Sequence, residues 1–140
     1  MKKIIVTGII IICICILFVG CANRDKAALA EWLQSIGNEN VEVYFWRDLG
    51  IDERLLSKDE VQTFCTILAG ITSDKLTWNR ELAGITPEYG LRLVIDEEVW
   101  WINQEDGPYG QSDFYFRKKQ WCIDSLELSD FMNSLLEDQQ

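Results

Sequence analysis

The sequence predicts an α+β fold in which an antiparallel sheet of about five or six strands packs against two or three amphipathic helices. Three segments repeat apolar residues at helical spacing, near the start, the middle and the end of the chain beyond residue 26. Alternating β-branched and aromatic segments cluster between the second and third of them, with few crossovers. About 119 residues follow Cys21, enough for one hydrophobic core and too few for two. We therefore expect one domain.

The N-terminus has the layout of a secretory signal. Lys2 and Lys3 precede an almost wholly apolar run from Ile4 to Gly20, and Cys21 follows. As a helix this run would span about 25 Å, somewhat less than the hydrocarbon core of a bilayer. It also exceeds the usual apolar core of a signal peptide, about 7 to 15 residues. Its length therefore leaves both a cleaved signal and an uncleaved membrane span open.

The residues at the junction favour the cleaved signal. Leu17, Phe18, Val19, Gly20 and Cys21 resemble the lipobox of bacterial lipoproteins, although Phe18 stands where Leu is common. The resemblance implies diacylation of the Cys21 thiol, with palmitate among the expected chains, and cleavage before Cys21. Two or more acyl chains give stable anchoring, whereas one gives marginal binding.

The resemblance also sets the expected organisation. Residues 1–20 are the signal peptide, residues 21–26 a tether, and residues 27–140 one extracytoplasmic domain. The domain is expected at the outer face of the cell membrane, or at the outer membrane if the producer has one. An uncleaved span would place the domain on the same side. The tail "KKQWCIDSLELSDFMNSLL" is vaguely similar to small uncharacterised lipoprotein domains of Gram-positive bacteria, a likeness that implies no function.

The first half of the domain predicts helix, strand, helix, strand. "KAALAEWLQSIG" places Leu29, Trp32, Leu33 and Ile36 on one helical stripe, and Gly37 ends it. "VEVYFW", residues 41–46, is typical of a strand. In "SKDEVQTFCTILAG" the pair Ser57 and Glu60 forms a capping box before a stripe of Val61, Phe64, Cys65 and Leu68. "KLTWN" predicts a short strand, and residues 80–90 a loop.

The second half predicts two hairpins and a final helix. In "LRLVIDEEVWWIN" a turn around Glu97 and Glu98 puts Leu91, Leu93, Ile95, Trp100 and Ile102 on one face. Glu-Glu suits a two-residue primed turn poorly, so we expect a four-residue loop of the same parity. In "SDFYFRKKQWCID" a turn at Lys118 and Lys119 groups Phe114, Phe116, Trp121 and Ile123. A helix over about 126–137 buries Leu128, Phe131, Met132 and Leu135.

The sequence has no histidine, which excludes Ser-His-Asp and Cys-His nucleophile systems and the common histidine-containing zinc sites. We expect no cofactor and no metal, because the acidic clusters at residues 96–98 and 105–106 do not match a calcium loop. An oxidising exterior would permit a disulfide between Cys65 and Cys122. Cys65 is predicted on a helix that faces the core, and Cys122 on the opposite face of the sheet. The sheet would then separate the two thiols, so we predict no bridge.

One group of residues stands out as a candidate partner-binding face. The hairpin face turned away from the predicted core collects aromatic and arginine side chains, which are enriched in recognition surfaces. The group comprises Arg92, Val94, Trp101, Tyr115 and Arg117, with Tyr44 and Trp46 joining it if Val41, Val43 and Phe45 face inward. The alternative, which three amphipathic helices slightly favour, is that one helix covers this face and makes Trp101 ordinary core.

The net charge limits the classes of partner that the domain can bind. Without Lys2 and Lys3 the chain has 11 Lys and Arg against 23 Asp and Glu, a formal charge of −12 that repels nucleic acid. The first reading is a non-catalytic binding module for an unknown protein, peptide or cell-wall partner. The second is an immunity or inhibitor lipoprotein that intercepts a cationic peptide or toxin. The third is a small cell-wall hydrolase, which needs two carboxylates about 5 to 9.5 Å apart in a cleft.

Overall fold

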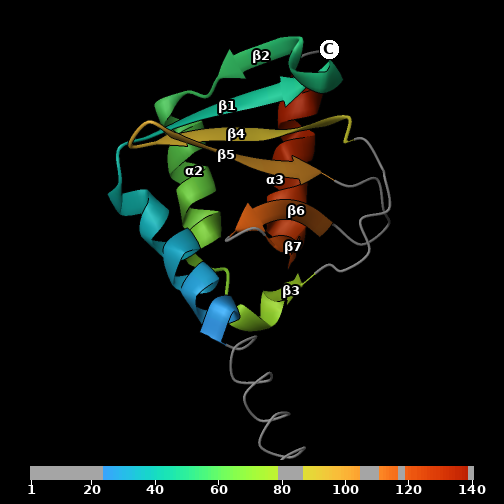
Figure 1. Ribbon diagram of the computed structural model, residues 1–140. Helices are drawn as coiled ribbons and strands as arrows, with labels where there is room; N and C mark the ends of the chain where they lie inside the picture. The colour runs from blue at the N-terminus through green and yellow to red at the C-terminus, as the bar shows by residue number, and fades with distance from the viewer. Residues whose placement is uncertain (1–23, 79–86, 105–110, 117–118, 139–140) are drawn as a thin grey trace, which may run out of the picture.

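The computed structural model describes residues 24–78, 87–104, 111–116 and 119–138, with only the backbone described at residues 49 and 111–115. This part of the chain has three α-helices and one antiparallel sheet of seven strands in the order β2-β1-β4-β5-β6-β7-β3 (Figure 1). The helices are residues 24–35, α2 (Lys58–Ala69) and α3 (Leu126–Glu137). The strands are β1 (Val41–Arg47), β2 (Asp52–Leu55), β3 (Leu76–Trp78), β4 (Tyr89–Ile95), β5 (Glu98–Gln104), β6 (Gln111–Phe116) and β7 (Lys119–Asp124). Short 3-10 turns are η1 (Ile36–Asn38), η2 (Asp48–Gly50) and η3 (Ser73–Lys75). The predicted α+β fold is confirmed.

The sheet has one strand more than predicted, because β2 pairs with β1 at the sheet edge. Its sequence, DERL, lacks the apolar alternation by which strands are recognised. Three ion pairs hold β2 instead: Asp52 with Arg47, Glu53 with Arg92, and Arg54 with Glu60. Edge strands need only one backbone partner, so β2 forms without burying a face of its own.

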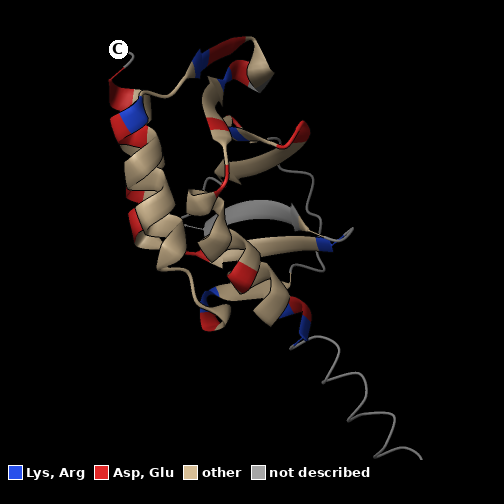
Figure 2. Ribbon diagram, turned by 90° about the vertical axis from the view of Figure 1, so that its left-hand side faces the viewer, with Lys and Arg blue, Asp and Glu red and all other residues tan. Residues whose placement is uncertain are grey.

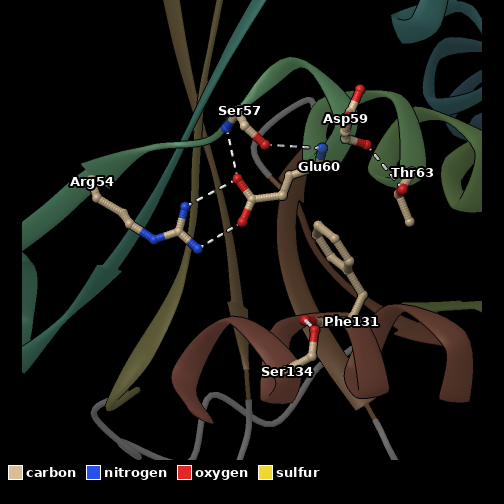
Figure 3. A network of polar contacts seen from close by, with 7 residues as sticks. All are labelled: Arg54, Ser57, Asp59, Glu60, Thr63, Phe131 and Ser134. Atoms are coloured by element: carbon tan, nitrogen blue, oxygen red, sulfur yellow. Dashed lines mark hydrogen bonds and ion pairs between the residues drawn. The ribbon is translucent and has the colours of Figure 1, made fainter. Parts of the chain in front are cut away.

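The helices begin and end close to the predicted positions. Ser57 caps α2, with its Oγ 3.4 Å from the Glu60 amide nitrogen and the Glu60 carboxylate accepting from the Ser57 amide at 2.6 Å (Figure 3). The same carboxylate accepts two bonds from Arg54, at 2.7 and 3.1 Å. The predicted capping box therefore also fastens β2 to α2. The predicted stripes supply the core, with the following side chains almost fully buried: Leu29, Leu33, Ile36, Phe64, Leu68, Leu128, Met132 and Leu135.

The turn between β4 and β5 differs from the prediction. Ile95 pairs with Glu98, so Asp96 and Glu97 alone form the turn, with φ angles of 48° and 69°. The expected four-residue loop is wrong, because both turn residues adopt the left-handed conformation whose twist matches that of the strands. The pairing shifts by two residues, which preserves the faces, and Leu93 and Ile102 remain in the core.

The second hairpin shows the same two-residue shift. Phe116 pairs with Lys119, and Phe114 pairs with Trp121. The predicted core residues Phe116, Trp121 and Ile123 are buried. The predicted turn at Lys118 and Lys119 is wrong for Lys119, which already belongs to β7. Residues 117–118 lie outside the described residues.

All three described helices pack on one face of the sheet, and α2 and α3 run behind the strands in Figure 1. The opposite face, called here the outer face, carries none of them. The expectation that a helix covers this face is therefore wrong for the described part of the chain. A single helical layer suffices because the three stripes converge on one core with Val43, Phe45, Leu91 and Leu93 of the sheet.

Cys65 and Cys122 form no disulfide with each other, as predicted. Cys65 lies on α2 and packs against the core, whereas Cys122 lies on β7 between Trp121 and Ile123, which face that core. Strand alternation therefore puts Cys122 on the outer face and places the sheet between the two thiols.

The start of the described chain lies next to edge strand β3, and β2 is the far edge in Figure 1. Residues 24–26, assigned above to the tether, are helical, and Asp25 forms an ion pair with Lys119. The Lys119 ammonium also lies 5.0 Å from the centre of the Trp78 ring on β3. Among the described residues, none of the helices is both long and apolar enough to cross a membrane.

Candidate functional site: the outer face of the sheet

Four side chains form a row across the outer face, one from each of β2, β1, β4 and β5. Leu55 pairs with Tyr44, Tyr44 with Arg92, and Arg92 with Trp101. Residues directly opposite one another on one face have Cβ atoms about 4.5–5.5 Å apart, so each of these side chains neighbours the next one across the sheet. The row is exposed at both ends, because Leu55 is 55% exposed and Trp101 is 42% exposed. A partner would therefore meet an aliphatic and an aromatic side chain with an arginine between them.

Arg92 is held rigidly at the centre of this row. Its Nε and Nη2 each donate to one oxygen of Glu53 at 2.6 Å, a two-pronged ion pair that joins β4 to β2 across β1. Its guanidinium carbon lies 4.0 Å from the centre of the Tyr44 ring and 6.0 Å from that of Trp101. Such stacking suits the flat guanidinium and would not suit a lysine ammonium. The geometry fixes both the arginine and its neighbouring ring before a partner arrives.

Tyr44 is held from its hydroxyl end as well. The hydroxyl donates to the Glu42 carboxylate at 2.8 Å, and this hydrogen bond raises the pKa of Tyr44 above its ordinary value. Tyr44 therefore stays protonated and acts as a donor, not as a phenolate. Glu42 extends the row toward the carboxylates of the Asp96–Glu97 turn.

The ring of Trp46 packs against the ring of Trp101. Their ring centres are 5.9 Å apart at an interplanar angle of 74°, an edge-to-face contact. Trp46 is only 4% exposed, and among the described residues no group accepts a hydrogen bond from its indole nitrogen. Trp46 is therefore a buried residue that positions Trp101 and is not itself part of the exposed surface of the site.

The structure brings together most of the predicted face. Tyr44, Trp46, Arg92 and Trp101 lie on adjacent strands, and the neighbouring row contributes Val94 paired with Val99, which is 50% exposed. Tyr115 pairs with Gln120 in the β6–β7 ladder, but its side chain is not among those described. Arg117 lies outside the described residues.

Sequence reasoning missed Leu55 and Glu53, both on β2. Leu55 is exposed and Glu53 is the ion-pair partner of Arg92. The run of alternating charge in "DERLL" carries no strand signal, so no pattern placed these residues on the outer face. Glu53 lies 39 positions before Arg92 in the chain, so no local pattern pointed to this pair.

Three described carboxyl groups have a pKa below the ordinary value. Arg92 lowers the pKa of Glu53, and Arg54 with the Ser57 amide lowers that of Glu60 to about 2. The Thr72 hydroxyl lowers the pKa of Asp74 in the same direction. A general acid in a glycosidase needs the opposite shift. Within the described ranges there is also no cluster of three or more Cys, Asp or Glu that could hold a metal ion.

No known protein family matches the sequence, and no match was found among curated proteins. The fold resembles that of a candidate lipoprotein from Clostridium perfringens seen in a crystal structure. The TM-score is 0.63 at 12% sequence identity, and the likeness covers 81% of this chain and 97% of that protein. The two share a fold over nearly the whole length of the clostridial protein.

Proposed function

We propose that the protein is an extracytoplasmic lipoprotein, anchored through Cys21, whose outer face binds a partner without catalysing a reaction. The row Leu55, Tyr44, Arg92 and Trp101 carries this proposal. Soluble proteins normally cover or charge the faces of their sheets, and a face that carries exposed aromatic and aliphatic side chains around an ordered arginine, with none of the described helices on it, marks a contact site. Because Arg92 and Tyr44 are already fixed, binding costs little side-chain entropy.

The position of the row relative to the tether supports the proposal. Strand β3 lies beside the first described helix, and β2 lies six strand spacings away, about 29 Å at the usual spacing. The row occupies β2, β1, β4 and β5, the four strands farthest from β3. An anchor at Cys21, three positions before the first described residue, would hold these strands away from the bilayer and accessible to a partner.

Site-specific photocrosslinking in the producing cells tests the docking surface. A photoreactive phenylalanine analogue replaces Val99 on the outer face or, as the control, Leu126 on α3, because these side chains are 50% and 66% exposed. We expect a discrete crosslinked species from position 99 and none from position 126, and we expect Trp101→Ala to abolish it. Equal products from both positions, or no product from position 99, would refute the proposed surface.

A further inference from the structure

Three shallow grooves adjoin one another where η1 leads into β1, at the end of the sheet that carries the Asp96–Glu97 turn. Their volumes are about 300, 480 and 320 Å³. The first two share Asn40 and Glu42, the last two share Asp96, and the first and third share Glu39. The three grooves therefore lie next to one another around this end of the sheet.

Apolar side chains lie among the polar ones that line the three grooves. Val41, Leu56 and Val61 line the groove between β1 and α2. Trp32, Ile36 and Trp100 line the groove between the first helix and the β4–β5 hairpin. Val94 lies in the groove between them, which opens onto the outer face. A ligand lying across the three grooves would meet apolar side chains chiefly in the first and third, with acidic side chains beside them.

The rim carries carboxylates that no cation neutralises. Within the described chain, none of the five carboxylates Glu39, Glu42, Asp96, Glu97 and Glu98 forms an ion pair, and Lys58 is the one cation lining the grooves. Four cations elsewhere each hold one carboxylate: Arg47, Arg54, Arg92 and Lys119. Five carboxylates without an ion-pair partner among the described residues therefore surround these grooves. Figure 2 shows that acidic residues also lie on the helices, so the grooves hold only part of the negative charge.

We propose that this end of the sheet, together with the outer face, binds a cationic amphipathic peptide segment. Its lysines and arginines meet the five carboxylates, and its apolar side chains fill the grooves and reach Val94 and Val99. Glu42 joins the two parts, because it lines two of the grooves and also accepts the hydrogen bond of Tyr44. The inference rests on the proposed function and names the chemistry of the partner at that surface. Charge complementarity of this kind guides encounter and selects partners.

Binding of a short synthetic peptide of alternating lysine and leucine clusters tests the inference. The full chain is placed in nanodiscs of neutral phosphatidylcholine, with empty nanodiscs as the blank. We expect binding of this peptide, no binding of its Lys→Glu analogue, and weaker binding of its Leu→Gln analogue. The affinity should fall as salt is raised, because the carboxylates are exposed.

A pair of matched variants assigns the binding to the grooves. Glu42→Gln with Asp96→Asn and Glu97→Gln removes three charges from the rim, and asparagine tolerates the left-handed conformation of residue 96. Glu127→Gln with Asp130→Asn and Glu137→Gln removes three charges from exposed positions on α3. We expect the rim variant to lose about tenfold or more in affinity and the α3 variant to stay within about threefold.

Equal losses in both variants would show that net charge alone attracts the peptide and would overturn the inference. Absence of binding by the unaltered protein would overturn it as well. Neither result changes the crosslink expected from position 99. A failure of the cationic-peptide inference can therefore be distinguished from a failure of the proposed docking surface. If the triple rim variant folds poorly, the single substitutions Asp96→Asn and Asp130→Asn give the same comparison, and equal losses again overturn the inference.

Discussion

The indole of Trp46 lies over Gly90 on the neighbouring strand. A Cβ atom built on Gly90 would stand 3.1 Å from Cζ2 of Trp46 and 2.4 Å from the backbone oxygen of Ile102. The missing side chain lets the indole pass across β4 and meet the edge of Trp101 on β5. The exposed aromatic of the docking surface therefore depends on a glycine two strands away from the edge.

Gly90→Ala should destabilise the domain by about 1–3 kcal/mol, because the added methyl group can be accommodated only by moving backbone. Urea unfolding followed by tryptophan fluorescence measures the change. Gly70→Ala is the matched control, since Gly70 ends α2 with helical φ and ψ angles and should cost less than about 0.5 kcal/mol. If both variants unfold at the same urea concentration, the close packing of Trp46 on Gly90 is not maintained in solution.

The ion pair of Arg92 with Glu53 should show measurable coupling. A double-mutant cycle with Arg92→Met and Glu53→Gln is expected to give about 1 kcal/mol, at the upper end for pairs that remain partly exposed. Arg92→Lys should lose most of this coupling, because an ammonium cannot hold both carboxylate oxygens and the Tyr44 ring at once. A coupling energy near zero would mean that the arginine is not fixed before binding.

The Glu60 carboxylate should make stability depend on acid pH. Its pKa is lowered from 4.5 to about 2 by Arg54 and by the Ser57 amide, so the folded state favours the ionised form. The stabilisation is complete above pH 4.5 and is lost as the pH falls from 4.5 toward 2. Glu60→Gln should cost about 1–2 kcal/mol at neutral pH and flatten the curve of stability in that interval. An unchanged curve would contradict this assignment.

The thiol of Cys65 should react slowly. Partial burial raises its pKa, so less of the reactive thiolate is present at pH 8. In a Cys122→Ala variant we expect a disulfide reagent to modify Cys65 about tenfold more slowly than in the urea-unfolded chain. Peptide mapping under non-reducing conditions should find no linkage between Cys65 and Cys122 in the unaltered protein. Such a linkage would require the sheet to open.

Processing at Cys21 is tested by the intact mass of the membrane-extracted protein. We expect a chain that begins at Cys21 and carries acyl groups, whereas Cys21→Ala should retain residues 1–20. The variant with Ala at both Cys13 and Cys15 is the control and should be processed normally. An unprocessed chain beginning at Met1 in the unaltered protein would refute the lipid anchor and leave the outer face unaffected.

Most secondary structure could be predicted because it depends on local patterns. The capping box at Ser57 and the apolar stripe after it define α2, and α3 occupies the predicted residues 126–137. The two hairpins have the predicted faces although both registers are shifted by two residues, since a shift of two leaves the alternation intact. Strand β2 was missed because ion pairs and backbone bonds hold it, and neither leaves a hydropathy pattern.

The candidate site was only partly predictable for the same reason. The alternation of side chains along the strands placed Tyr44, Arg92 and Trp101 on one face of the sheet. Whether a helix covers that face depends on how the apolar stripes of the three helices pack against the sheet. The ring of Trp46 can pack across β4 because position 90 is a glycine, and sequence reasoning assigned Gly90 to a loop. The partner of Arg92 comes from a segment 39 positions away in the chain.

The sequence by itself determined the fold class, the helices, the faces of the hairpins, the excess of negative charge and the lipobox-like junction at Cys21. Each of these follows from neighbouring residues or from composition. Only the tertiary structure decided that all three described helices share one face, that Leu55 joins Tyr44, Arg92 and Trp101 in one row, and that five carboxylates surround neighbouring grooves without an ion pair to any described residue. These are contacts between distant segments, and their energies depend on packing and pairing that no local pattern encodes.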